Sequence, residues 1–154
     1  MDLLRSDVMV ALDDVQVACQ RARETHLMVA GAVGDAGLGA YLRGVAEARA
    51  QAAEWLVGLL RREDDIPHKP AEELELLRKV SVWTQALLHA GDSAILLQSR
   101  DEELRLESAA VAALELPMDD AWRDGLTALL ADAREKIDEM TRRMADAAGR
   151  RDEP

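Results

Sequence analysis

Several residue types are scarce in this chain of 154 residues, and each scarcity excludes a class of protein. Cys19 is the single cysteine, so no disulfide can form within the chain, which fits a reducing cytoplasm. Phenylalanine is absent and aromatic residues make up only 3 %, so aliphatic side chains must fill the core. The 19 Lys and Arg residues are outnumbered by 30 Asp and Glu, which argues against binding to nucleic acid, since phosphates require a basic face.

Long apolar runs are absent as well. No stretch approaches the roughly 18 uncharged apolar residues that a membrane-spanning helix needs. Residues 1–7 include acids where a secretory signal carries basic residues, and no apolar run follows them. We therefore expect a cytoplasmic protein with no membrane segment.

The chain is nevertheless rich in hydrophobic residues, at 49 %, which excludes a disordered acidic tail. Apolar residues recur with the period of a helix in every long segment, and no segment alternates like a strand. The sequence therefore predicts an all-α protein. We assign residues 1–148 to a single domain and residues 149–154 to a charged flexible tail.

Glycines, prolines and charged turns divide the chain into five predicted helices. They cover residues 3–30, 36–62, 71–90, 93–116, and a last helix that starts at 117 or 119 and ends near 148. Asp35 and Asp92 are the predicted N-caps of the second and fourth helices. Four of the helices are long enough to form a bundle, and the short helix 71–90 is expected to cross between two hairpins. The prediction is a ferritin-like four-helix bundle with an additional helical crossover; five helices stacked up and down are the alternative.

Two groups of residues carry a resemblance to a known family. The first comprises Val33–Leu42, Ala46–Arg49 and Ala53–Leu56, and the second comprises Trp83, Ala90–Leu96, Asp101–Glu103 and Leu116–Pro117. In spacing these segments resemble a small bacterial ferritin-like family, catalogued as domain of unknown function 2383. The resemblance implies a ferritin-like bundle with no settled activity and links the chain to stress responses. Two family features are replaced: Val80 stands where a histidine often precedes the tryptophan, and the first helix lacks a late aromatic residue.

Ferritin-like bundles raise the question of a carboxylate-bridged di-iron centre. Such a centre needs a Glu from each of two helices and a Glu-x-x-His from each of the other two, and this chain contains no Glu-x-x-His. Only Glu103, Glu107 and His26 face the apolar side of their helices, too few donors for two hard cations. We therefore predict no metal site, no cofactor and no catalytic residue. The alternative is an iron-binding, oxidase-like protein whose ligands are these three residues.

Two charged residues interrupt apolar stripes. Arg49 lies in the centre of the stripe of helix 36–62, and Glu103 lies in the centre of the stripe of helix 93–116. An unpaired interior charge costs several kcal/mol, so we predict an Arg49–Glu103 ion pair, with Glu107 or Ser99 completing its hydrogen bonds. Three interpretations stay open: a structural device that fixes helix register, a vestigial metal site in which Arg49 replaces the cation, and a pocket for an anion or small ligand.

The first two helices carry more apolar surface than one core requires. On helix 36–62 the surplus residues are Tyr41, Ala48, Trp55 and Leu59. This surface either packs under the crossover helix or forms the face of a homodimer, and we favour the homodimer because both helices have the excess. With no catalytic motif present, the sequence favours a non-enzymatic structural or protein-interaction bundle, whose protein partner it does not name.

Overall fold

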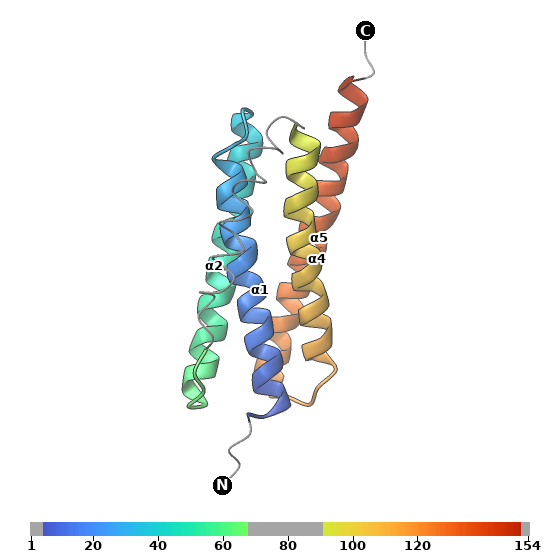
Figure 1. The fold of residues 1–154 in the computed structure, drawn as a ribbon. Helices are drawn as coiled ribbons and strands as arrows, with labels where there is room; N and C mark the ends of the chain where they lie inside the picture. The colour runs from blue at the N-terminus through green and yellow to red at the C-terminus, as the bar shows by residue number, and fades with distance from the viewer. Residues whose placement is uncertain (1–4, 68–90, 152–154) are drawn as a thin grey trace.

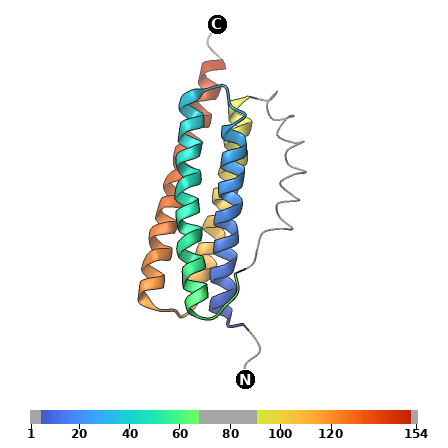
Figure 2. The ribbon, with the colours of Figure 1, turned by 90° about the vertical axis from the view of Figure 1, so that its left-hand side faces the viewer.

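The computed structural model describes residues 5–67 and 91–151 (Figures 1 and 2). These residues form four helices and no strand: α1 (Asp7–Ala30), α2 (Ala36–Arg62), α4 (Asp92–Leu114) and α5 (Asp120–Arg151). The all-helical prediction is therefore confirmed. The helix predicted at residues 71–90 lies outside the described residues. Of the four described helices, none combines the length and the apolar character needed to cross a membrane.

The starts of α2 and α4 differ in how they are capped. Asp35 caps α2 as predicted, and its side chain accepts a hydrogen bond from the Leu38 backbone N–H at 2.9 Å. At α4 the cap is Gly91, and the predicted cap Asp92 is instead the first helical residue. Gly91 has a φ of 92°, a conformation that glycine adopts at little cost and aspartate does not.

The outer ends of the first and last helices also differ from the prediction. α1 begins at Asp7 rather than at residue 3, because the Ser6 side chain caps it by accepting a hydrogen bond from the Met9 N–H. α5 continues through Gly149 to Arg151, so the predicted break at residue 149 is wrong. A single glycine near a helix end costs only about 1 kcal/mol, which does not stop a helix of this length.

The four helices form two antiparallel hairpins, α1 with α2 and α4 with α5, packed side by side through α1 and α4 (Figures 1 and 2). α2 and α4 run in the same direction and occupy opposite corners of the bundle (Figures 1 and 2). The chain leaves α2 at one end of the bundle and enters α4 at the other (Figure 1).

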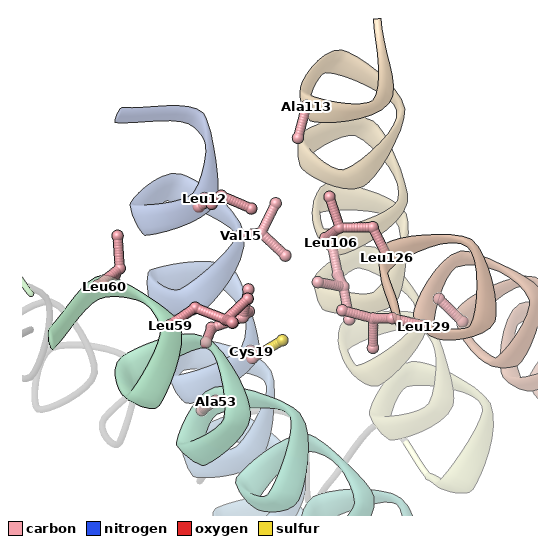
Figure 3. Close-up of a cluster of buried hydrophobic side chains, with 12 residues drawn as sticks. Leu12, Val15, Cys19, Ala53, Leu59, Leu60, Leu106, Ala113, Leu126 and Leu129 are labelled. Atoms are coloured by element: carbon pink, nitrogen blue, oxygen red, sulfur yellow. The ribbon is translucent and has the colours of Figure 1, made fainter. Parts of the chain in front are cut away.

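Apolar side chains from all four helices fill the interior in two separate clusters. The Leu12 cluster includes Leu12, Cys19, Leu56, Leu106 and Leu126, and Figure 3 shows how its side chains meet between the two hairpins. The Leu42 cluster lies near the α1–α2 turn and comprises Val29, Ala30, Leu38, Leu42, Val45, Ile95, Leu96 and Met140. On α1, α2 and α4, polar residues separate the two clusters in the sequence, so the bundle has a polar layer across its middle.

Large side chains bridge the seam between α2 and α5. The Trp55 indole lies over Gly125, where a Cβ atom would overlap the ring. Arg143 stacks over the Tyr41 ring at 4.2 Å from its centroid. Leu59 is buried in the Leu12 cluster, and Ala48 is half-buried. Three of the four residues predicted as an oligomer face thus make contacts within one chain, while the homodimer itself stays a prediction.

Candidate functional site

Each of the four helices contributes one side chain to the polar layer in the middle of the bundle. His26 comes from α1, Arg49 from α2, Glu103 from α4 and Asp132 from α5. The side chains of His26, Arg49 and Glu103 are at most 1 % exposed, whereas that of Asp132 is 37 % exposed. The layer therefore runs from the centre of the bundle to its surface at α5.

The Arg49–Glu103 ion pair predicted from the sequence is present at the centre of this layer. Arg49 Nε donates to Glu103 Oε1 at 3.0 Å, and Arg49 Nη2 donates to Glu103 Oε2 at 2.8 Å. Two parallel bonds between a guanidinium and a carboxylate form the strongest and most directional kind of ion pair. Because α2 and α4 occupy opposite corners, this pair links the two hairpins across the core.

The residues that complete the hydrogen bonds of this pair are not the predicted ones. His26 Nε2 contacts Glu103 Oε1 at 2.7 Å, and Asp132 Oδ2 contacts Arg49 Nη1 at 2.8 Å. The predicted role of Glu107 is wrong, because this side chain lies one turn further along α4 and pairs with Arg134 at 3.0 Å on the surface. The predicted role of Ser99 is also wrong: within residues 5–67 and 91–151 its hydroxyl has no hydrogen-bond partner.

These contacts decide the charge of each group. Burial alone favours the neutral form of Glu103, but the bonds from His26 and Arg49 outweigh it and lower the pKa of this carboxyl. Burial likewise opposes the charge of Arg49, yet its bonds to Glu103 and Asp132 raise the pKa of the guanidinium. The pKa of Asp132 is lowered in the same way, because Arg49 and Lys136 outweigh its partial burial. At neutral pH the layer thus holds ionised, mutually neutralising partners.

The contact with Glu103 also defines the tautomer of His26. An ionised carboxylate can only accept hydrogen bonds, so Nε2 must carry the hydrogen and donate it. In the neutral imidazole Nδ1 then presents an unshared electron pair, and in the imidazolium it carries a second hydrogen. Among the described residues no group donates to this atom, although the histidine is fully buried.

Three further fully buried side chains carry polar atoms that no described residue satisfies: Gln16, Thr25 and Ser99. Buried polar groups are nearly always hydrogen-bonded, so each of these atoms requires an explanation. Cys19 lies on the same side of α1 as His26 and is also fully buried. Burial raises the pKa of its thiol to about 12, which makes the reactive thiolate scarce at neutral pH.

A second buried ion pair, which the sequence analysis did not assign, joins α1 to α4. Arg21 Nε donates to both oxygens of Glu102, at 3.0 Å and 3.2 Å, and the Glu102 side chain is only 2 % exposed. Nothing in the sequence indicates that Glu102 is buried, because it belongs to the acidic run 101–103 and runs of acidic residues usually lie in solvent. Only the arginine on the facing side of α1 distinguishes Glu102 from the exposed Asp101.

The three alternative iron ligands are not brought together. His26 and Glu103 are in contact, but Glu107 points to the surface and Arg49 occupies the interior side of Glu103. Within the described ranges, no three His, Cys, Asp or Glu side chains are grouped so that they could hold a metal ion. The arrangement instead suits a fixed charge network, in which every carboxylate oxygen of Glu103 and Asp132 has a partner.

A groove of about 340 Å³ lies elsewhere, at the end of the bundle where α2 and α4 begin. Acidic and basic side chains line it together, including Asp35, Asp92, Glu139 and Arg143. Arg143 already pairs with Glu139 at 3.0 Å. The groove contains none of the residues that the sequence predicted as a site.

No protein-family model, curated protein or solved structure matches this chain. A function can therefore be proposed only from the sequence and from the structure described above.

Proposed function

We propose that this chain is a non-enzymatic, ferritin-like helical bundle with a structural or protein-interaction role. The main support is that Arg49, Glu103 and Asp132 in the polar layer each have an oppositely charged partner within the chain. Arg49 holds both oxygens of Glu103 and one oxygen of Asp132, and Lys136 lies 3.3 Å from the other. Neither carboxylate keeps a pair of oxygens for a metal or a substrate, so the layer fixes the register of the four helices.

The course of the chain supports the ferritin-like part of this proposal. A plain up-and-down bundle joins neighbouring helix ends by short loops, whereas here α2 ends and α4 begins at opposite ends of the bundle (Figure 1). Ferritin-like bundles contain one such long connection. We extend the proposal to the family resembled by the sequence, domain of unknown function 2383, and to the stress-related role that the resemblance implies.

The outer face of α4 supports the interaction part. This helix buries Ser99, Glu102 and Glu103, while Leu97 and Leu104 remain 45 % and 38 % exposed. The two leucines lie two turns apart on one face, a spacing typical of contacts with another helix. We propose that this face, rather than the Tyr41 to Leu59 stripe of α2, is where two copies of the chain meet as a homodimer.

Charge at the same face favours a second copy as the occupant. Asp101 and Arg105 are both exposed and lie on either side of Leu104 along α4. If the twofold axis is perpendicular to α4 and passes near residue 103, the two α4 helices run antiparallel and Asp101 of each copy lies near Arg105 of the other. Opposite charges at the rim of a contact assist association and fix its register.

Iron loading tests the non-enzymatic interpretation against the oxidase alternative. Protein purified without chelator and reloaded anaerobically with ferrous iron is expected to hold far less than one iron per chain. Oxygen should then produce no di-iron oxo absorption band, and Glu103→Gln should leave the iron content unchanged. About two irons per chain, lost in Glu103→Gln, would instead identify Glu103 as a ligand and contradict the proposal.

Sedimentation equilibrium tests the homodimer. At micromolar concentration the mass is expected to be about twice the 16.9 kDa of one chain. Leu104→Glu should return it to the mass of one chain without loss of helical circular dichroism, because it places a charge in the contact. Leu27→Glu is the matched control, since Leu27 is a similarly exposed leucine on α1. A wild-type chain that sediments as a monomer excludes the dimer, and dissociation by the control variant excludes the α4 face.

A further inference from the structure

Three polar atoms on the facing helices α1 and α4 are buried without a partner among the described residues. They are the hydroxyl of Thr25, the hydroxyl of Ser99 and Nδ1 of His26, and all three side chains are fully buried. No residue within 5–67 or 91–151 donates to them or accepts from them. Leaving such groups unpaired in the interior is costly, because each has lost its bonds to water.

Two polar contacts between the helices show that these atoms lie at a similar height along the bundle. Arg21 on α1 pairs with Glu102 on α4, and His26 pairs with Glu103. Thr25 lies one turn beyond Arg21 towards the α1–α2 turn. Ser99 lies one turn before Glu103, and since α1 and α4 are antiparallel, this is towards the same end of the bundle (Figure 1). Thr25 and Ser99 therefore flank His26 at the α1–α4 interface.

The two hydroxyls are also unusual in how they are used. A helical Thr or Ser commonly donates to the carbonyl four residues earlier, as Thr127 does to Arg123 and Thr141 does to Ile137, both at 2.8 Å. Thr25 and Ser99 make no such bond. Both hydroxyls therefore remain available to hydrogen-bond a third group at the α1–α4 interface.

We propose that a buried water molecule binds between α1 and α4, held by Thr25 Oγ1, Ser99 Oγ and His26 Nδ1. Nδ1 requires a partner whether it accepts, as in the neutral imidazole, or donates, as in the imidazolium. A water molecule both donates and accepts, and three partners match the usual number for a buried water. An anion is disfavoured, since it would lie close to the ionised Glu103.

This water joins the hydroxyls to the charged layer. A continuous set of hydrogen bonds then leads from Ser99 and Thr25 through His26, Glu103 and Arg49 to the partly exposed Asp132. His26 is anchored through both ring nitrogens. The water thereby fixes the orientation in which the imidazole donates to Glu103.

Removing each hydroxyl tests the site through the sign of the stability change. Thr25→Val and Ser99→Ala are each expected to increase the equilibrium constant for unfolding, measured in urea, by about 5–30-fold, because each removes one partner of the water. In the double variant the unfolding constant should increase by less than the product of the two single increases, since both substitutions remove partners of the same water molecule. Thr127→Val is the matched control, because its hydroxyl is exposed and bonds its own helix; its change should be near onefold.

Hydroxyls without any partner would give the opposite result, because their removal would leave stability unchanged or increase it. That outcome overturns the proposal. Water-to-protein NMR cross-relaxation provides a second measurement. The wild-type protein is expected to show a long-lived internal water near the His26 and Ser99 amides, and the double variant should lose this signal. A wild-type protein without the signal, or a double variant that keeps it, also overturns the proposal.

Discussion

Replacement of Glu103 by leucine is expected to lower the free energy of unfolding by about 3–5 kcal/mol at neutral pH. The carboxylate is fully buried, and its loss leaves the Arg49 guanidinium in the core with only Asp132 for a partner. His26 Nε2 loses its acceptor in the same step. Urea denaturation measures the effect through the midpoint, provided that the slope of the transition is unchanged.

Glu107→Leu is the matched control for this experiment. Glu107 lies one turn from Glu103 on the same helix, but it pairs with Arg134, whose side chain is 57 % exposed. A surface pair of this kind contributes at most about 1 kcal/mol. If Glu103→Leu costs no more than Glu107→Leu, the Arg49–Glu103 pair is not the fixed buried contact described above.

The double variant Arg49→Leu, Glu103→Leu distinguishes the interaction between the two charges from the cost of burying either charge alone. Replacing a buried ion pair by apolar side chains of similar volume is often neutral, whereas breaking it from one side is not. The double variant is therefore expected to be more stable than either single variant. A loss equal to the sum of the single losses would show that the two residues do not interact.

Periodicity and chain breakers predicted the helices well, because each local signal acts within one or two turns. Asp35 before an apolar stripe and the glycines around it place the start of α2. Arg49 and Glu103 were also visible, since a charge in the centre of an apolar stripe is rare and must find a partner. Both inferences depend on the residue and its own helix, not on how helices pack.

The partners of the pair depend on packing and were missed. Asp132 flanks the apolar stripe of α5 instead of interrupting it, and a long arginine side chain reaches it from the core. His26 and Glu103 meet because side chains lean towards the N-terminus of their helix, so side chains of antiparallel neighbours lean towards each other. A comparison of residue heights along the bundle axis, corrected for this lean, could have predicted the contact between His26 and Glu103 from the sequence.

For a related reason, the sequence did not identify α5 as the helix that contacts the surplus apolar stripe of α2. The pattern shows that Tyr41, Trp55 and Leu59 need cover, but it does not show which helix supplies it. Gly125 on α5 makes room for the Trp55 indole, and Arg143 on α5 stacks on Tyr41. Single residues on a distant helix thus decide whether such a stripe is interior or surface.

Replacement of Arg49 by leucine is expected to cost about 3–5 kcal/mol at pH 7 and to reverse the response of stability to acid. In the wild-type protein the pKa of Glu103 is lowered in the folded state, so its contribution is complete above its unfolded pKa of about 4.3 and is lost as pH falls below it. Without Arg49, burial is opposed only by His26, and the folded state holds a proton more tightly than the unfolded state.

The sign then follows from proton counting. Where the folded state binds more protons than the unfolded state, stability rises as pH falls, by up to about 1.4 kcal/mol per pH unit for one proton. The difference in the free energy of unfolding between wild type and Arg49→Leu should therefore become smaller as the pH falls from 7 to 5. Arg134→Leu, which removes an exposed arginine, should stay parallel to wild type over this range, and a gap that remains constant for Arg49→Leu would show that Arg49 does not keep Glu103 ionised.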